Sequence, residues 1–104
     1  NSGSFFKNPI ISTEQFLELQ KKNPAIPSYK ISEIETKVPA GWLVEQCGFK
    51  GKRFGDAGVH KKQALVLVNY GNASGKEILQ LARTIQKSVL ETFKITLEIE
   101  VNII

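Results

Sequence analysis

A long amphipathic helix around residue 80 constrains the fold of this chain more than any other feature. Ser74 followed by Glu77 is the pattern of a capping box, in which each side chain accepts a hydrogen bond from the other residue's backbone N–H. Apolar side chains then recur at intervals of three and four residues, at Ile78, Leu81, Ala82, Ile85, Val89 and Phe93. Such a helix must bury its apolar face, so the rest of the chain has to supply a surface that covers it.

Segments with strand character flank this helix. Before it, residues 59–60 and 64–69 are the expected arms of a hairpin that turns through Lys61 and Lys62. The second arm is apolar on both faces, which predicts a central strand. After the helix, Leu97, Ile99 and Val101 alternate with Glu98, Glu100 and Asn102. This alternation predicts a terminal strand with one face in the core and two carboxylates on the other.

The first quarter of the chain predicts an edge strand followed by a helix. Residues 5–11 combine aromatic and branched side chains with Pro9, which lacks a backbone donor and therefore suits an edge strand. Ser12 and Gln15 then form a second capping-box pattern, and Pro24 stops the helix that they begin.

The middle of the chain predicts a short helix between less regular segments. Residues 28–31 fit either a brief strand or a turn. Pro39 lies where its missing N–H costs nothing, in the first turn of a helix, and Gly48 can adopt the left-handed conformation that ends it. Glycines recur among residues 49–58, which predicts a structured loop there.

These elements together predict an α+β fold. A chain of 104 residues and 11.6 kDa allows one domain. The helices and strands do not follow the regular alternation that a parallel sheet requires. We therefore expect a single small domain in which helices pack against one largely antiparallel sheet.

Composition limits the classes of function. Apolar runs are far shorter than the roughly 20 residues that cross a bilayer, and no charged start leads into an apolar core, so neither a membrane span nor a signal peptide is expected. One cysteine and one histidine cannot build a disulfide framework or a four-ligand zinc site, and this cysteine content favours the cytoplasm.

The net charge of +4 suits an anionic partner without identifying one. Because methionine is absent, the chain is expected to be a piece of a longer protein.

Side chains with catalytic chemistry are few and do not form a self-contained set. The candidates are Ser4, Lys7, Asn8, His60, Gln63, Glu98 and Glu100. A serine nucleophile needs a histidine held by a carboxylate, and no motif around His60 indicates one. The glycines near residue 55 lack the strand and helix that flank a nucleotide-binding loop. On composition alone, a structural or surface role explains each candidate better than catalysis does.

A resemblance to a known family favours a catalytic or binding role for several of these candidates. Several blocks follow one another in order: Gly3-Ser4-Phe5-Phe6-Lys7-Asn8-Pro9, residues 39–48, Lys50-Gly51, Ala57-Gly58-Val59-His60, residues 63–69, Gly71-Asn72-Ala73 and residues 97–101. Together they resemble the C-terminal domain of the UDP-N-acetylenolpyruvoylglucosamine reductases, the MurB flavoenzymes of peptidoglycan precursor synthesis. The blocks cover nearly the whole chain, so coincidence in one motif does not explain the match.

The resemblance implies that residues 1–104 are the substrate-binding domain of a bacterial UDP-N-acetylmuramate dehydrogenase. In that family the preceding domains hold FAD, NADPH supplies the hydride, and the substrate is UDP-N-acetylglucosamine enolpyruvate. This oxidoreductase serves cell-wall biogenesis, and with it cell shape and cell division. The isolated domain is then expected to bind neither cofactor and to be inactive.

The resemblance also implies roles for four residues. It places the proton donor at Ser4, and at Glu100 the acidic residue that polarises the enolpyruvyl group. Asn8 matches a position that contacts the substrate diphosphate, and Gln63 matches a further substrate contact. Two positions depart from the family pattern, because Ile99 replaces a usual proline and could loosen the strand that aims Glu100, and Asp56 replaces a frequent glycine.

The alternative interpretation is a basic α+β module that binds RNA or another polyanion. Modules of that kind expose aromatic side chains among Lys and Arg on a sheet, whereas the aromatic residues here are placed for core packing. The first interpretation expects the substrate and the FAD-binding domains of the same chain as partners, and neither nucleic acid nor a membrane.

Overall fold

The computed structural model describes residues 6–62, 67–69, 71–72 and 74–99. The helices are α1 (Thr13–Lys22), α2 (Ala40–Gln46) and α3 (Gly75–Phe93). The strands are β1 (Ile10–Ser12), β2 (Tyr29–Lys30), β3 (Glu35–Lys37), β4 (Arg53–Phe54), β5 (Ala57–Val59) and β6 (Leu67–Asn69). The predicted α+β class is therefore confirmed. No helix among these residues is long and apolar enough to cross a membrane.

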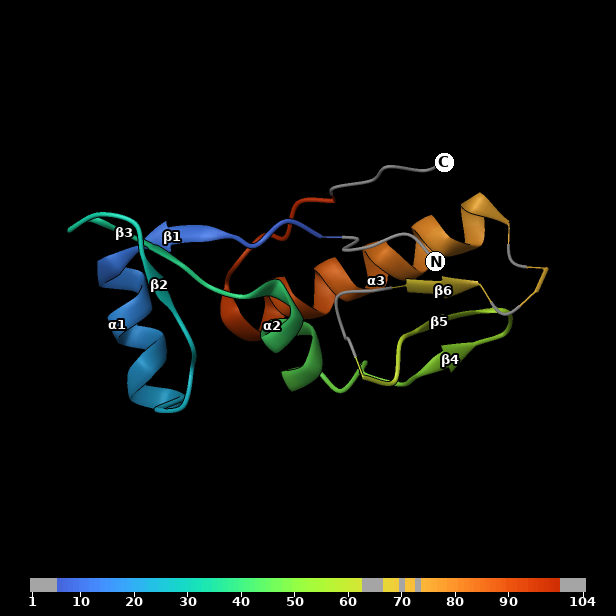
Figure 1. Cartoon of the computed structure of the whole chain (residues 1–104), viewed down its shortest axis with the longest axis horizontal. Coiled ribbons are helices and arrows are strands. Elements are labelled where there is room, and N and C mark those ends of the chain that lie inside the picture. Colours follow the sequence, from blue (N-terminus) through green and yellow to red (C-terminus); the bar gives the residue numbers. More distant parts are fainter. Residues whose placement is uncertain (1–5, 63–66, 70, 73, 100–104) are drawn as a thin grey trace.

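Among the described residues the strands form two antiparallel sheets instead of the single sheet that the sequence predicted. One sheet has the order β1-β3-β2 and the other the order β4-β5-β6. They lie at opposite ends of an elongated molecule, 45 × 24 × 21 Å, with α2 between them and α3 running along the second sheet (Figure 1). Each sheet is made from one contiguous stretch of chain, residues 10–37 or residues 53–69.

The first sheet begins later than predicted. The expected strand over residues 5–11 is replaced by β1 at Ile10–Ser12, because Pro9 has no N–H with which to continue a ladder. Phe6 pairs with Ile99 in an isolated bridge that lies outside β1. Within the sheet, the buried Thr36 hydroxyl lies 3.0 Å from that of Thr13 at the start of α1. The segment near residue 30, where a strand or a turn fitted equally well, is strand β2.

Helix α1 begins and ends where the sequence predicted. The Ser12 hydroxyl accepts the Gln15 N–H at 3.1 Å, and the helix ends at Lys22, just before Pro24. The Gln15 side chain does not close the expected capping box. Its amide instead donates to the Lys94 carbonyl at 3.2 Å, which joins α1 to the chain that leaves α3.

Helix α2 also follows the prediction closely. Pro39 is its N-cap, one residue before the first turn, and Gly48 takes the left-handed conformation (φ 84°) just after its end. Ala40, Leu43 and Val44 bury the helix in the core.

The predicted loop over residues 49–58 is wrong in part, because it contains most of a hairpin. Arg53 and Phe54 pair with Gly58 and Ala57 across a two-residue turn. Gly55 opens that turn at φ 64°, a conformation that glycine adopts without strain. The predicted pairing of residues near 59 with residues 67–69 is confirmed, but among the described residues β5 is the central strand and β6 an edge.

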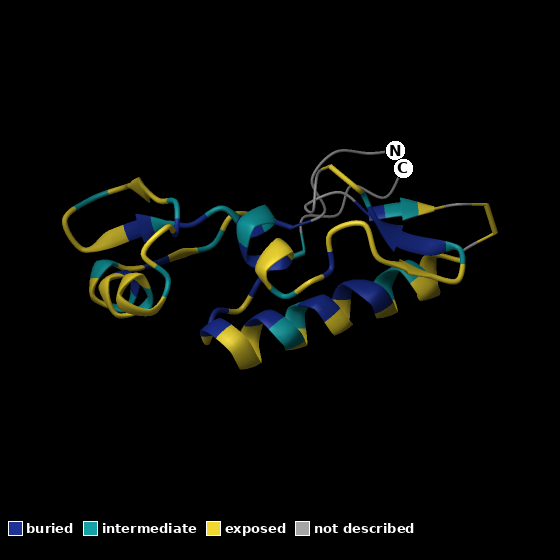
Figure 2. Ribbon diagram, turned by 90° about the horizontal axis from the view of Figure 1, so that it is seen from below, coloured by how far each residue is buried: buried dark blue, intermediate teal, exposed yellow. Residues whose placement is uncertain are grey.

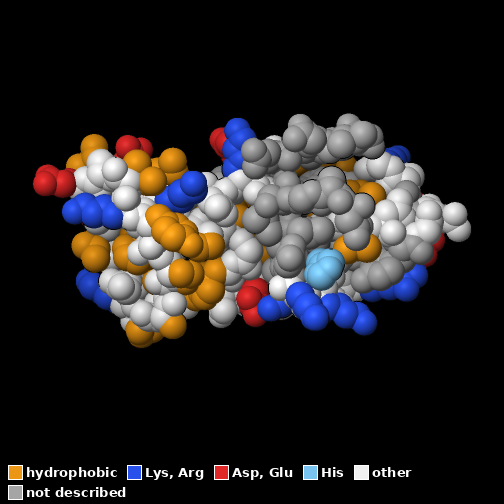
Figure 3. Space-filling model, viewed as in Figure 1, with side chains coloured by type: hydrophobic (Ala, Val, Ile, Leu, Met, Phe, Trp, Pro, Cys, Tyr) orange, Lys and Arg blue, Asp and Glu red, His pale blue; other side chains and the backbone are white. Residues whose placement is uncertain are grey.

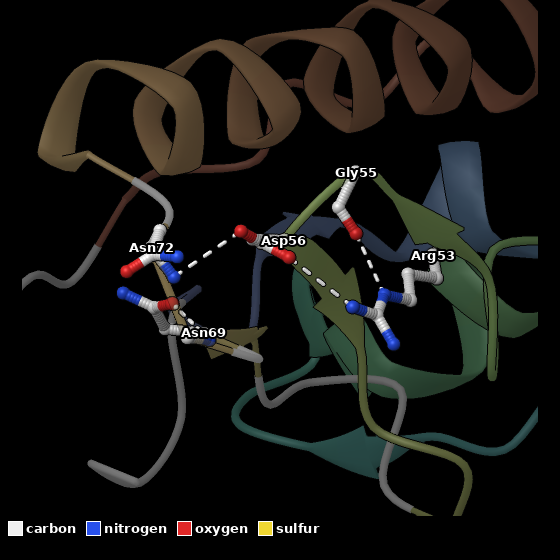
Figure 4. A network of polar contacts seen from close by, with 6 residues as sticks. Arg53, Gly55, Asp56, Asn69 and Asn72 are labelled. Atoms are coloured by element: carbon white, nitrogen blue, oxygen red, sulfur yellow. Dashed lines mark hydrogen bonds and ion pairs between the residues drawn. The ribbon is translucent and has the colours of Figure 1, made fainter.

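Asp56, one of the two residues expected to depart from the family pattern, organises this turn. Its carboxylate accepts from the Arg53 guanidinium at 3.2 Å and from the Asn72 backbone N–H at 3.2 Å, while Arg53 also donates to the Gly55 carbonyl at 2.6 Å (Figure 4). The Asn69 side chain accepts the Gly71 N–H at 2.9 Å. Asp56 therefore connects the β4–β5 turn to the chain after β6 by a hydrogen bond. Glycine, which has no side-chain acceptor, could not make this contact.

Helix α3 fulfils the strongest sequence prediction. Both hydrogen bonds of the Ser74–Glu77 capping box are present. Its apolar face is buried while the opposite face is exposed to solvent (Figure 2). After it, Ile95 and Leu97 are buried and Thr96 and Glu98 exposed, so the predicted alternation holds to residue 98. Among the described residues only the Phe6–Ile99 bridge pairs this segment, and Val101 and Asn102 lie outside them.

Candidate functional site

The beginning and the end of the described chain meet at one place. Phe6 and Ile99 form an antiparallel bridge, and the Lys7 N–H donates to the Glu98 carbonyl at 2.9 Å. Phe6 and Leu97 are almost completely buried, so this junction is anchored in the core. Ser4 and Glu100, which the sequence singled out, lie outside the described residues.

A groove lies beside this junction. It has a volume of about 310 Å³ and is lined by Lys7, Asn8, Pro9, Ile10, Thr96 and Glu98. The Lys7 ammonium is 3.9 Å from the Glu98 carboxylate, and both side chains are more than half exposed. An exposed pair at this distance stabilises the fold little, so both charges remain available to solvent or a ligand. Three of the sequence candidates, Lys7, Asn8 and Glu98, are thus brought together.

Asn8 has a structural contact that sequence reasoning missed. Its Oδ1 accepts the backbone N–H of Ala40, at the start of α2, at 2.9 Å. Pro39, the N-cap residue, has no side-chain acceptor, so Asn8 performs this function from 32 residues away. Proline at an N-cap is the one signal that could have indicated a remote capping residue. Asn8 as a residue is nevertheless exposed and lines the groove.

Positive side chains gather beside the histidine (Figure 3). They come from two loops in contact, because a Cβ on Gly51 would meet the Lys61 Cα at 3.7 Å. Two of the cations are paired, Lys50 with Glu45 at 3.3 Å and Arg53 with Asp56 at 3.2 Å. The Lys52, Lys61 and Lys62 ammonium groups add positive charge without an ion pair in the described part of the chain. Such a surface favours the approach of anions.

His60 has a local structural contact. Its Nδ1 accepts the Lys62 backbone N–H at 3.0 Å, so the neutral ring carries its proton on Nε2. This contact shapes the turn that precedes Gln63. Gln63 itself, the predicted further substrate contact, lies outside the described residues.

Cys47 does not have the features of a reactive thiol. Burial raises the pKa of the Cys47 thiol, and a hydrogen bond with Thr92 opposes that shift without reversing it. The thiol is therefore protonated at neutral pH and is a weak nucleophile. In the part of the chain that the structure describes, no three His, Cys, Asp or Glu side chains gather as a metal site would require.

Comparison with known proteins gives a consistent result. Residues 1–104 match the family described as UDP-N-acetylenolpyruvoylglucosamine reductase, C-terminal domain. The chain is 65% identical to the UDP-N-acetylenolpyruvoylglucosamine reductase of Flavobacterium johnsoniae, over all of this chain and 31% of that protein. It is 54% identical to the reductase of Porphyromonas gingivalis, over all of this chain and 31% of that protein. With the Pseudomonas syringae reductase it shares 52% identity, over 99% of this chain and 30% of the relative.

These matches have two consequences. The chain spans about a third of the length of the curated relatives it matches. The alternative of a basic RNA-binding module finds no support, since the family and the three relatives are all reductases by name.

Proposed function

Because this chain belongs to the UDP-N-acetylenolpyruvoylglucosamine reductase family as its C-terminal domain, we propose that it is the substrate-binding part of such an enzyme. The match of residues 1–104 to that domain is the observation that carries the proposal. The complete enzyme would use NADPH to reduce UDP-N-acetylglucosamine enolpyruvate to UDP-N-acetylmuramate for peptidoglycan, and so serve cell-wall biogenesis, cell shape and cell division. We place it in the cytoplasm, where an unpaired thiol such as Cys47 stays reduced.

The cofactors belong to the part of the enzyme outside this chain. FAD held there would carry the hydride from NADPH to the substrate. The groove beside Asn8, at about 310 Å³, has the size of the smallest ligand pockets and suits a phosphate or part of a sugar, not a dinucleotide. This chain would therefore bind and orient the substrate, supply the proton, and meet the flavin-binding domains of its own polypeptide as its partner.

Ser4 is the proposed proton donor. Hydride addition to the terminal carbon of the enolpyruvyl group leaves negative charge on the neighbouring carbon, which must then take a proton. That carbon is far more basic than a carboxylate, so a neutral hydroxyl can act as the acid where a glutamate would already be ionised. The pairing of Phe6 with Ile99 supports a shared site, because these are the described residues nearest in sequence to Ser4 and Glu100.

The other proposed site residues bind the substrate. Glu100 would donate a hydrogen bond to the substrate carboxylate if burial against the ligand raised its pKa enough to keep it protonated. Asn8 would contact the diphosphate, and its exposed position beside Lys7 supports that role. Gln63 would make a further substrate contact; it directly follows, in sequence, the lysines at 61 and 62, whose positive charge favours an anionic ligand.

The proposal is tested by separating the two half-reactions of the full-length enzyme. We expect Ser4→Ala to leave reduction of the flavin by NADPH nearly unchanged. Reoxidation by the enolpyruvyl substrate should slow by about 10² to 10⁴, since that is the usual contribution of a positioned general acid. Stopped-flow absorbance of the flavin measures both steps.

Ser28→Ala provides the matched control. Ser28 is exposed in the loop before β2, and its hydroxyl makes no polar contact with the other described residues, so this variant should behave as the unsubstituted enzyme in both steps. A full-length protein that does not oxidise NADPH in the presence of the enolpyruvyl substrate would overturn the proposed function. Equal slowing of both steps by Ser4→Ala would show instead that Ser4 is a structural residue.

A further inference from the structure

We propose that Gln86, on helix α3, is a positioning residue for the reaction. Its side-chain amide holds residues 95–99, the segment that leads directly into Glu100 in the sequence, and thereby orients the Glu100 carboxyl. The inference rests on the proposed function, in which that carboxyl binds the enolpyruvyl group. It adds α3 to the site through a residue that need not touch the substrate.

One hydrogen bond joins α3 to this segment. After the helix the chain turns at Lys94, which has a φ of 59°, and comes back beside α3 (Figure 1). There the Gln86 Nε2 donates to the Leu97 carbonyl at 2.7 Å, in a partly buried contact. Among the described residues this amide is the only donor to that carbonyl. Its removal would leave a shielded acceptor unpaired, which is costly.

The segment is held on both of its edges. Burial alternates along residues 95–98, as in an extended chain, where consecutive carbonyls point to opposite edges. The Leu97 carbonyl meets Gln86 on one edge, and the Glu98 carbonyl accepts the Lys7 N–H at 2.9 Å on the other. The buried side chains of Ile95 and Leu97 fix the face that is turned to the core. These contacts together restrict rotation and sliding of the segment, and so limit the direction in which the chain continues to residue 100.

The residue at position 99 makes these contacts more important. The family pattern expects a proline there, whose ring would fix φ near −65°. Ile99 leaves that dihedral free to vary, so the hydrogen bonds that precede it have to restrain the segment instead. The Gln86 amide is the one side-chain group among the described residues that donates to the backbone of residues 95–99.

A double-mutant cycle in the full-length enzyme tests the inference. Gln86→Leu removes the donor and keeps a good helix former. At saturating enolpyruvyl substrate it should slow reoxidation of the reduced flavin by about 10- to 100-fold, since a displacement of about 1 Å can cost as much. Reduction of the flavin by NADPH should not change. In a Glu100→Ala background the same substitution should slow reoxidation by less than about 2-fold, because the group that Gln86 orients is then absent.

Gln86→Arg tests whether the N–H donor is what matters. Arginine keeps donors that can reach the Leu97 carbonyl and forms helices about as well as glutamine. This variant should therefore recover most of the reoxidation rate that Gln86→Leu loses. Circular dichroism and the melting temperature show whether each variant folds.

Gln80→Leu is the matched control, with the same change on the same helix. Gln80 is exposed, and its side chain makes no hydrogen bond with the other described residues, so neither half-reaction should change. Gln15→Leu provides a second comparison. The Gln15 amide donates to the Lys94 carbonyl at 3.2 Å, ahead of the buried Ile95 and Leu97, so its loss should leave the reoxidation rate unchanged.

Several results would overturn the inference. An unchanged reoxidation rate in Gln86→Leu would show that the contact with Leu97 does not position Glu100. An equal loss with and without the Glu100 carboxyl would show that the two residues act independently. Equal slowing of both half-reactions, or the same loss in Gln80→Leu, would indicate general damage to the fold. Failure of a folded Gln86→Arg variant to recover any of the rate would show that the donor is not what holds the segment.

Failure of the proposed function would give a different result. If Glu100→Ala alone had no effect while the enzyme still reduced the enolpyruvyl substrate, the role of Glu100 and this inference would both be wrong, and the activity would stand. If the unsubstituted full-length protein did not transfer hydride from its reduced flavin to that substrate, the proposed function itself would be overturned, and this inference with it.

Discussion

Two glutamates at the end of the chain carry the same chemical group, and only one has a proposed catalytic role. Glu98 is exposed at the groove and lies 3.9 Å from Lys7, a pairing that solvent weakens. Glu100 lies two residues further on and has the role implied by the family. The pair therefore offers a comparison between neighbouring carboxylates on one segment.

We expect Glu100→Ala to slow reoxidation of the reduced flavin by about 10² to 10⁴, and Glu100→Gln to slow it much less. Glutamine keeps the shape and a hydrogen-bond donor, so it replaces a protonated carboxyl but not a charged one. Glu98→Gln in the full-length enzyme is the comparison: Glu98 lines the groove but has no proposed part in the reaction itself, so at saturating substrate this variant should change the rate little. Equal losses for Glu100→Gln and Glu100→Ala would mean that negative charge is required.

At the scale of the elements, glycine serves two different purposes in this chain. Gly55 opens the β4–β5 turn with a positive φ of 64°, while Gly75 is the first residue of α3. A Cβ on either residue would meet no atom within 4 Å. Any difference between the two substitutions to alanine must therefore come from the backbone conformation.

Gly55→Ala should lower the free energy of unfolding by about 1–2 kcal/mol, because an L side chain disfavours that conformation. Gly75→Ala should leave it unchanged or raise it by about 0.4–1 kcal/mol, since alanine restricts the unfolded chain. Urea denaturation followed by circular dichroism measures both values. Similar effects of the two substitutions would contradict the conformational explanation.

The elements that were predicted well are those whose signals are local. The Ser74–Glu77 capping box and the apolar spacing define α3 within one stretch of sequence, and the structure confirms both. The β4–β5 hairpin was missed because strand β4 has only two residues and strand β5 only three, and because the glycines around them suggested a loop. The contact of Asn8 with Ala40 joins residues 32 apart, and nothing in local sequence indicates it beyond the proline N-cap.

At the scale of the whole molecule, the chain is about a third of its relatives, and this limits what it can do alone. We expect the isolated residues 1–104 to be colourless, to leave NADPH unoxidised and to bind the UDP-sugar weakly. The reason is that the flavin site and part of the substrate contacts would lie in the rest of the enzyme. Absorbance spectra and calorimetry beside the full-length protein provide the check, and a yellow sample with stoichiometric flavin would contradict the expectation.

Because each sheet is assembled from one contiguous stretch of chain, the two sheets can unfold locally and independently of each other. Residues 10–37 and residues 53–93 each hold their own sheet and helix, so they can lose protection from solvent exchange as separate cooperative units. The first unit exposes Tyr29, Ile31 and Ile34, whereas all three residues of β5 and one face of α3 are buried. Hydrogen–deuterium exchange should therefore label the amides of β1, β2 and β3 well before those of β5 and central α3. A single exchange rate across both stretches would mean that the domain opens only as a whole.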